Sequence, residues 1–466
     1  MRTGILGAVF ALASTMALAQ DATPLLWAVH NGDVADVERL IRAGANVNAK
    51  NEFGATPMSE AALAGNTAII ERLLKAGANP DSPGADGQTA LMVIARTPNV
   101  AAARLLLAAG ANVNAAETQR KQTAVMWAAA QSQAAMVREL VARGADVNAI
   151  SLVNDIASQV SPEPRALYRS YGGLTALLYA TREGCLDCVK ALVEGGAKID
   201  LADPEGVTPL ITAIWNMRFD TAAYLIAAGA NVDKWDWWGR SPLYCAVDVN
   251  TLPRGGRPDA PSLDETTSLD VIRMLLEKGA NPNLQLKLLP PFRNIGADRG
   301  VDQMLTIGAT PLLRAAKALD APAVELLLRH GANPNLGNVR NTTPVMAAAG
   351  LGSVDADTRG VYTTEDTPQR SVATLDLLIK AGGDIHLVDF RGQTPLHGAA
   401  FWGWNAAVQF LVDKGATLDA KDLKGMTPID SALGRAGGNS RGGQRIDVHE
   451  DTAELLRSLI AKSATR

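Results

Sequence analysis

The sequence contains few of the residues that metal, redox and cofactor sites usually require. Its 466 residues include 3 Cys and 5 His, and aromatic residues account for 5% of the chain. No Gly-rich loop of the kind that cradles phosphates occurs. The His residues lack metal-ligand spacing and lie at positions 30, 330, 386, 397 and 449. We therefore predict no metal site, no cofactor and no enzymatic activity.

Positive charge is also in short supply. The 44 Lys and Arg residues are outnumbered by 48 Asp and Glu residues, which gives a formal net charge of -4. A protein that binds nucleic acid needs clustered Lys and Arg to neutralise phosphates, so we expect no nucleic-acid partner. A 47% hydrophobic content indicates a folded chain. The length exceeds what one hydrophobic core supports, which leaves several domains or a repeat array.

Long hydrophobic runs are missing except near the N-terminus, where an apolar stretch extends from Ile5 to Met16. This stretch follows Arg2, is too short to span a bilayer and precedes small residues. The pattern is typical of a signal peptide that is cleaved between Ala19 and Gln20. No Cys near that site could carry a lipid. We expect a periplasmic or secreted protein that is not embedded in a membrane, with a bacterial source.

The most abundant feature of the sequence is an internal repeat. A Thr or Ser followed by Pro or Ala occurs at eleven positions, which are Thr23, Thr56, Thr89, Thr123, Thr175, Thr208, Ser241, Thr310, Thr343, Thr394 and Thr427. The successive spacings are 33, 33, 34, 52, 33, 33, 69, 33, 51 and 33 residues. Six gaps therefore share one period, and the three long gaps indicate insertions.

Each unit predicts two helices joined by a turn. The Thr hydroxyl caps the first helix, and Pro at its first position lacks only an amide that would have no partner there. Small residues such as Ala61 and Ala62 allow close helix packing, and Gly65 provides the turn. The second helix ends at a Gly such as Gly77, which suits a left-handed C-cap. The polar segment that follows suits a hairpin turn.

This pattern resembles the ankyrin repeat, most clearly where Gly392-Gln-Thr-Pro-Leu-His397-Gly-Ala-Ala400 is followed by Gly415-Ala416. The resemblance extends from Thr23 to the C-terminus. It implies a mainly α-helical solenoid of about eleven helix-turn-helix units, with β-hairpin fingers and long loop insertions. Departures are few: Thr-Ala replaces Thr-Pro in three units, and His at the fourth motif position occurs only at His397.

The insertions divide the repeat array into segments. Residues 1-19 are the signal peptide, 20-151 hold repeats 1-4, and 152-172 form a finger insertion. Repeats 5-7 occupy 173-283, with an insertion between two helices at 250-268, and a second finger insertion covers 284-307. Repeats 8-11 and a C-terminal cap occupy 308-466, with an inter-helix insertion at 352-370.

The resemblance also implies where a partner protein docks, because ankyrin proteins generally bind through finger tips and the exposed end of each first helix. Exposed aromatic residues on this concave face are the candidate contacts. They are Trp215, Trp235, Trp237, Trp238, Phe390, Phe401, Trp402, Trp404, Tyr168 and Tyr171. Inserted loops that cover these rings are the alternative. We expect Trp27 and Trp127, by contrast, to face the next unit in the core.

Cys185 and Cys188 form a Cys-x-x-Cys motif at the start of a second helix. In an exported protein this pair could form a local disulfide. No thioredoxin-like pattern surrounds it, so a structural role is favoured over redox catalysis. We expect Cys245 to be a buried thiol outside any disulfide. Two alternative functions stay open: a thiol or stress-response accessory that uses Cys185 and Cys188, and a carbohydrate-binding module that uses exposed Trp residues.

Overall fold

The computed structural model describes residues 23-84, 86-154, 170-251, 262-288, 304-352, 366-435 and 448-464. The predicted signal peptide and much of each predicted insertion lie outside these residues. The chain divides into two compact units, residues 1-212 and 213-466, which we describe separately. Within the described residues, no helix has the length and apolar character that crossing a membrane would need.

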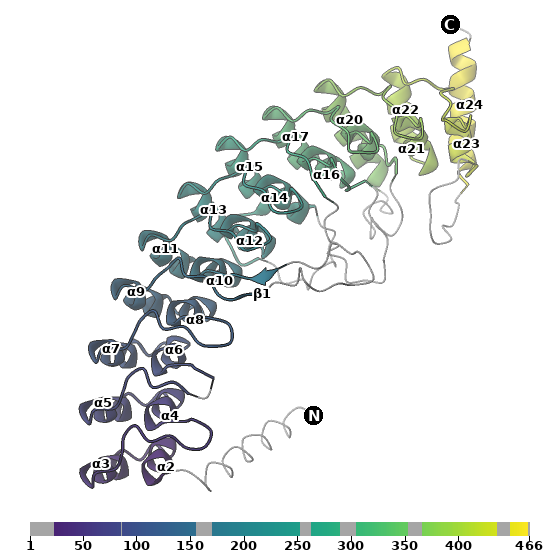
Figure 1. Cartoon of the computed structure of the whole chain (residues 1–466). Helices are drawn as coiled ribbons and strands as arrows, with labels where there is room; N and C mark the ends of the chain where they lie inside the picture. The colour runs from purple at the N-terminus through teal and green to yellow at the C-terminus, as the bar shows by residue number, and fades with distance from the viewer. Residues whose placement is uncertain are drawn as a thin grey trace. The chain divides into compact units, whose positions relative to one another are not determined.

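The first unit contains alternating first and second helices of the predicted repeat (Figure 1). Each first helix packs on its own second helix and on the first helices of the neighbouring repeats. The helices are α2 (Pro24–His30), α3 (Val34–Arg42), α4 (Pro57–Leu63), α5 (Thr67–Lys75), α6 (Ala90–Ala95), α7 (Val100–Ala108), α8 (Ala124–Ala130), α9 (Ala134–Ala142), α10 (Ala176–Glu183) and α11 (Leu186–Glu194). Helix α12 (Pro209–Trp215) contains the boundary between the units.

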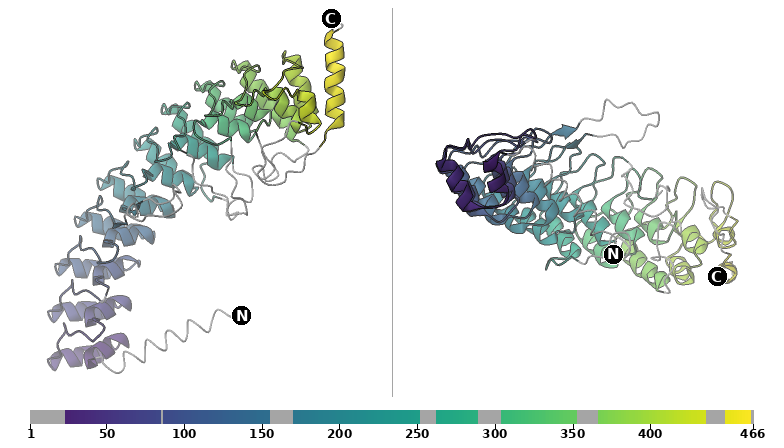
Figure 2. Two further views of the ribbon diagram at one scale, coloured as in Figure 1. Left: turned by 45° about the vertical axis from the view of Figure 1, so that its right-hand side comes forward. Right: turned by 90° about the horizontal axis from the view of Figure 1, so that it is seen from below.

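The second unit continues the alternation, and its two layers of helices can be followed in Figure 2. Its helices are α13 (Phe219–Ala227), α14 (Pro242–Asn250), α15 (Ser268–Glu277), α16 (Pro311–Lys317), α17 (Ala321–Arg329), α18 (Pro344–Ala348), α20 (Thr367–Lys380), α21 (Pro395–Phe401), α22 (Asn405–Asp413), α23 (Pro428–Ala432) and α24 (Glu450–Ala464). The 22 helices in the described residues make eleven repeats, as the Thr spacing predicts.

The predicted helix caps account for these boundaries. Thr56 caps α4 by accepting a hydrogen bond from the Ser59 amide at 3.1 Å, and Pro57 is the first helical residue. Such a cap stabilises a helix by roughly 1 kcal/mol. At the other end, Gly77 follows α5 with a φ of +85°, and no atom lies within 4 Å of a Cβ placed there. Glycine is therefore needed for its left-handed backbone and not for space.

Regular strands are scarce within the fingers. In the described residues, β1 (Val153–Asn154) pairs antiparallel with β2 (Tyr171–Gly172) at the two ends of the first finger insertion. One isolated bridge joins Ala116 and Thr123. The other described fingers are closed by tight side-chain-capped turns, so the β-hairpin expectation is met in full only at β1 and β2.

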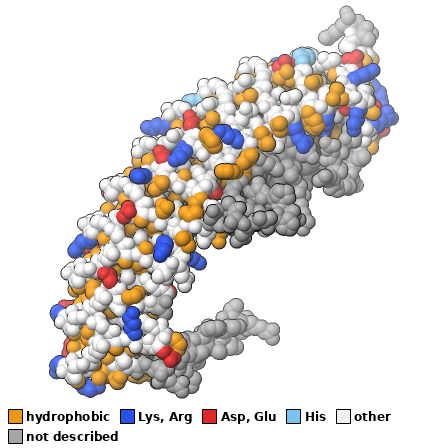
Figure 3. Space-filling model, in the orientation of Figure 1, with side chains coloured by type: hydrophobic (Ala, Val, Ile, Leu, Met, Phe, Trp, Pro, Cys, Tyr) orange, Lys and Arg blue, Asp and Glu red, His pale blue; other side chains and the backbone are white. Residues whose placement is uncertain are grey.

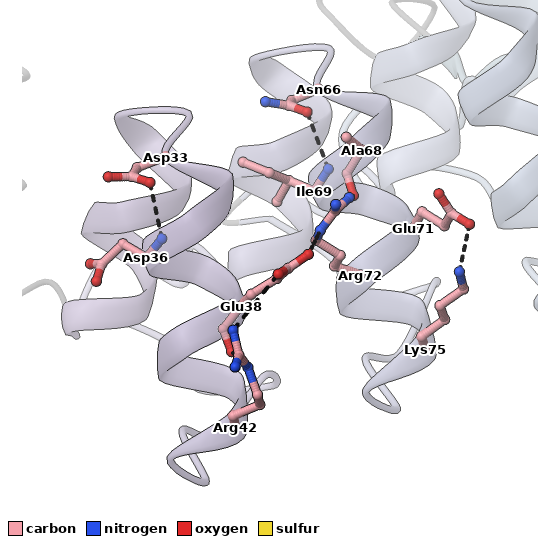
Figure 4. A network of polar contacts seen from close by, with 10 residues as sticks. All are labelled: Asp33, Asp36, Glu38, Arg42, Asn66, Ala68, Ile69, Glu71, Arg72 and Lys75. Atoms are coloured by element: carbon pink, nitrogen blue, oxygen red, sulfur yellow. Dashed lines mark hydrogen bonds and ion pairs between the residues drawn. The ribbon is translucent and has the colours of Figure 1, made fainter.

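Ion pairs cover the solvent-facing side of the second helices in the first two repeats (Figure 4). Glu38 of α3 pairs with Arg72 of α5 and with Arg42 one turn along its own helix. The hydrogen bond and charge of Arg72 lower the pKa of Glu38. On the face drawn in Figure 3, acidic and basic side chains are interspersed over most of the described surface, and several basic side chains lie close together near the C-terminal end. We read this side as a solvated surface.

Candidate functional site at the fingertips

Six described fingers close as tight turns around an Asp or Asn side chain, whereas Gly84 stands at the closing position of one first-unit finger and Glu117 closes the next. Asp236 Oδ1 accepts hydrogen bonds from the Trp238 amide at 3.0 Å and the Arg240 amide at 2.9 Å. The same pair of bonds, to the amides two and four residues further on, is made by Asn51, Asp203, Asn338, Asp389 and Asp422. This recurring closure fixes which residue stands at the tip, namely the one directly after the Asp or Asn.

The closing carboxylate of Asp422 is held ionised. Burial acts to raise the pKa of Asp422, but hydrogen bonds from the Met426 and Lys424 amides and from Gln393 outweigh it and lower the pKa below its ordinary value. The Asp422 carboxylate therefore stays ionised, and accepts the hydrogen bonds of its turn, throughout the neutral pH range.

Backbone hydrogen bonds also link neighbouring fingers of the second unit. The Phe390 amide donates to the Arg340 carbonyl at 2.9 Å, and the Leu423 amide donates to the Arg391 carbonyl at 2.8 Å. Earlier in the unit, the Lys287 amide donates to the Trp238 carbonyl at 2.8 Å. Each tip is thereby fixed relative to the next, so side chains on successive tips form a preorganised surface.

The tips of the second unit are apolar and exposed. The exposed fractions are 55% for Trp237, 63% for Val339, 43% for Phe390 and 81% for Leu423. We call these four residues the fingertip row. Exposed apolar groups that recur at equivalent positions differ from the scattered ones of an ordinary surface and are typical of an interaction site.

Cationic residues follow the last three members of the row. Arg340 follows Val339, Arg391 follows Phe390, and Lys424 follows Leu423. The guanidinium carbons of Arg340 and Arg391 lie 5.1 and 5.4 Å from the centre of the Phe390 ring. Both contacts are within cation–π range, so an exposed ring is flanked by two positive charges.

Sequence reasoning identified Trp237 and Phe390 but missed the other members of this site. Val339, Leu423 and the three cations are neither aromatic nor clustered in the sequence. Their signal is positional: each falls one or two residues after the Asp or Asn that closes a finger. An alignment of the eleven units on that residue would have shown the row.

In the predicted Trp cluster near the start of the second unit, Trp215 and Trp238 pack against the protein itself. The Arg240 guanidinium carbon lies 3.7 Å from the Trp215 ring centre and 4.3 Å from that of Trp238. Arg240 is 4% exposed and forms an ion pair with Asp236 at 2.6 Å. Trp238 is 6% exposed, so the expectation that its ring is exposed is wrong, and its contact with a partner stays a prediction. The buried ion pair holds an arginine against both rings.

Two other rings of this finger remain accessible. Trp235 is 43% exposed, with the Lys287 ammonium 3.2 Å from its ring centre, and Trp237 belongs to the fingertip row. Of the three Trp residues of this finger, Trp238 is buried, whereas Trp235 and Trp237 are exposed.

The predicted aromatic cluster of the tenth repeat also packs on the protein itself. Trp402 Nε1 donates to the Gly350 carbonyl at 2.9 Å, and its ring stacks on Trp404 with a centre distance of 6.0 Å. Trp404 is 4% exposed, so the expectation that its ring is exposed is wrong, and its contact with a partner stays a prediction. Phe401 is half-buried and meets Trp402 edge-on at 5.6 Å. These rings fill the space beside the turn of the preceding repeat.

The remaining predicted aromatics lie in the first unit. Tyr171 of β2 is 57% exposed, and Tyr168 lies outside the described residues. Trp127 is half-buried beneath Arg96, whose guanidinium carbon lies 3.8 Å from its ring centre. That position therefore faces the preceding repeat and not the next. Trp27 is 39% exposed because it occupies this position in the first repeat, so the prediction of a core role is wrong.

A disulfide joins Cys185 and Cys188, as the motif suggests. Cys185 is the N-cap of α11, and its sulfur accepts a hydrogen bond from the Cys188 amide at 3.3 Å. Asp33 and Asp320 fill the same role at α3 and α17. Cys245 is buried and outside the disulfide. Across the described ranges, no group of His, Cys, Asp and Glu is arranged to hold a metal ion.

Paired antiparallel helices that stack on their neighbours, with preorganised fingers at one edge, define a helical repeat scaffold. The sequence model described as "Ankyrin repeats (3 copies)" matches residues 8-84, 61-151, 152-236 and 369-457, and that described as "Ankyrin repeat" matches 238-287 and 307-339. These matches cover more than half of the sequence, and the chain belongs to the ankyrin-repeat family. Ankyrin repeats are scaffolds for protein–protein interaction and are typically not enzymes.

Curated relatives match over parts of their length. The mouse B-cell lymphoma 3 protein homolog is 32% identical over 187 residues, which are 40% of this chain and 27% of that protein. Human ankyrin repeat and SOCS box protein 16 is 29% identical over 258 residues, or 55% of this chain and 47% of that protein. The mouse protein phosphatase 1 regulatory subunit 12A is 43% identical over 58 residues, which are 12% of this chain and 6% of that protein.

Among solved structures, the ankyrin repeat domain of Bcl-3, titled a unique member of the IkappaB protein family, is similar with a TM-score of 0.40 and 24% identity. The similarity covers 48% of this chain and 94% of that one.

Proposed function

We propose that this chain is an exported scaffold that binds a partner protein through the fingers of its second unit. The observation that carries the proposal is the fingertip row, whose four exposed apolar side chains recur at one structural position. Neighbouring fingers in this part of the chain are hydrogen-bonded to each other, so little conformational entropy is lost on binding. Apolar anchors of this kind dominate the energy of protein interfaces.

The rest of the described surface offers weaker sites. The buried Trp238 and Trp404 cannot make contacts without local unfolding. The outer helices are covered by ion pairs such as that between Glu38 and Arg72, and exposed pairs contribute little to binding. The fingers thus combine exposure, apolar character and rigidity.

Export is the second part of the proposal. It is supported by the apolar segment Ile5–Met16 and the small residues before Gln20. N-terminal sequencing of the protein recovered from the periplasm of its host should begin at Gln20. A protein that retains Met1 and stays with the cytoplasmic fraction would refute export while leaving the binding proposal intact.

The binding proposal can be tested with matched triple variants. One carries Trp237→Ser, Phe390→Ser and Leu423→Ser, and its control carries the first-unit substitutions Phe53→Ser, Leu63→Ser and Tyr171→Ser. All six side chains are exposed, so both variants should keep the helical circular dichroism of the parent. Proteins captured from extract by the parent should be lost by the first variant, by tenfold or more, and retained by the control. Equal capture by both variants would refute the proposed surface.

A further inference from the structure

The fingers of repeats 9, 10 and 11 carry the same two-residue pattern at their tips. An apolar residue is followed by a cation in Val339-Arg340, Phe390-Arg391 and Leu423-Lys424. The apolar members are exposed, Lys424 is exposed, and the two arginines are half-buried. The pattern occurs on consecutive fingers although the whole chain has a net charge of -4. A local concentration of positive charge on an acidic protein indicates an acidic ligand.

The acidic residues nearest the tips are turned inward, although Asp389 offsets part of the charge of Arg391. Asp389 and Asp422 are buried at 4% and 8% exposure, and each accepts two backbone amides of its own turn. Asp389 also accepts the Arg391 Nε at 2.9 Å, which fixes that guanidinium beside Phe390. These two carboxylates therefore position the tips, and the two residues at each tip are apolar and cationic.

The spacing of the tips selects the form of the ligand. Packed helices lie about 8-10 Å apart, and successive fingers follow the same repeat. A polyproline II segment rises about 3.1 Å per residue and brings every third side chain to the same side, which gives a spacing of about 9.3 Å. A β-strand returns to the same side every second residue, at about 6.6-6.8 Å. The same-side spacing of polyproline II matches the spacing of the fingers, and that of a β-strand does not.

We propose that the fingertips of repeats 9 to 11 bind an extended acidic segment of a partner protein in which an apolar residue occupies every third position. This inference rests on the proposed function and specifies its ligand. The apolar residues of the segment contact Val339, Phe390 and Leu423. Carboxylates between them lie against Arg340, Arg391 and Lys424.

The test uses a fluorescein-labelled nine-residue peptide with leucine at every third position and glutamate elsewhere. Fluorescence anisotropy with the full chain measures its affinity. A peptide of the same composition with its three leucines adjacent tests the spacing, and one with lysine in place of glutamate tests the charge. Peptides of this length form little helix on their own, so their spacing is read in extended form. Both control peptides should bind at least tenfold more weakly.

Protein variants locate the binding. Arg340→Glu combined with Lys424→Glu should weaken binding of the first peptide by about tenfold or more, because two attractions become repulsions. Arg340→Lys combined with Lys424→Arg should retain it. The matched control is Arg120→Glu with Lys121→Glu, two exposed cations on a first-unit finger, and should leave affinity unchanged. Unchanged thermal unfolding of each variant confirms that the fold is kept.

The outcomes separate this inference from the function on which it rests. If the serine variant of the fingertip row loses its natural partner but all three peptides bind equally or not at all, the scaffold function stands and the ligand assignment is overturned. Weak binding that survives 1 M salt would also overturn it, because charge pairing is screened there. If the serine variant keeps its partner, the fingertip function itself fails.

Discussion

The two units share one finger construction but differ at the tips. In the first unit, Asn51 and Asp203 close turns whose tip residues are Glu52 and Pro204. In the second, the same closure presents the apolar fingertip row. Among the fingers that an Asp or Asn closes, the buried side is therefore constant, whereas the exposed side varies. The side chain of the closing Asp or Asn makes the hydrogen bonds of the turn. The residue at the tip can therefore vary, and serve binding, without a loss of stability.

Removing the closing carboxylate should have the largest effect, and a different effect in each unit. In Asp236→Ala the buried Arg240 loses its ion-pair partner, and the turn loses two backbone hydrogen bonds to Asp236 Oδ1. We expect a loss of about 3-5 kcal/mol in the free energy of unfolding. Asn51→Ala loses the turn acceptors without exposing a buried charge, and should cost about 1-3 kcal/mol. Thermal or urea unfolding measures both. Equal losses would show that the buried Asp236–Arg240 ion pair adds nothing to stability.

Acid should affect the second unit through His397. Burial lowers the pKa of this residue, although its hydrogen bond to the Met426 carbonyl and the charges of Asp422 and Asp389 oppose the shift. The unfolded chain therefore binds a proton first as the pH falls below about 6.5, and stability drops by up to about 1.4 kcal/mol per pH unit until the folded pKa is reached. His397→Gln should flatten this dependence. A parallel pH profile in the variant would contradict the assignment.

Helix caps should have an intermediate effect that depends on geometry. Thr310 accepts a hydrogen bond from the Leu313 amide at 3.1 Å, whereas the Thr123 side chain makes no cap hydrogen bond. Thr310→Ala should cost about 1 kcal/mol, and Thr123→Ala should be near neutral. Denaturant unfolding of the two variants under identical conditions compares them. A larger loss for Thr123→Ala than for Thr310→Ala would contradict the stabilising role of the Thr310 cap.

The smallest effect is expected at the disulfide of the first unit. Cys185 serves as the N-cap of α11, so Cys185→Asp with Cys188→Ala replaces it with the residue used at α3 and α17. Stability should stay within about 1 kcal/mol of the oxidised parent. Thermal unfolding with and without a dithiol reductant provides the comparison. Loss of partner capture in this variant would instead favour a thiol function.

The sequence predicted the repeat architecture well because each unit carries its own signals. Threonine caps, small residues and terminal glycines are local, and thirty-three-residue spacing repeats them. The accessibility of single aromatics could not be predicted in the same way. Trp237 and Trp238 are adjacent in sequence, yet one is exposed and the other lies against Arg240. Which ring is buried depends on the partner residue across the turn, and composition does not reveal it.

Local signals also do not determine whether a given position of the first helix faces the preceding repeat or the next one. Trp27 and Trp127 share one motif position, and the family pattern predicts that their rings face the next repeat. The contact between Arg96 and Trp127 shows that the position faces backwards. Only the packing of whole repeats determines that direction.

Hydroxyl-radical footprinting of the protein, alone and with its captured partner, tests the central claim most directly. Trp237, Phe390 and Leu423 should be protected in the complex, while Phe53 and Tyr171 should react equally in both states. Protection confined to Phe53 and Tyr171, with the fingertip row unchanged, would contradict the account.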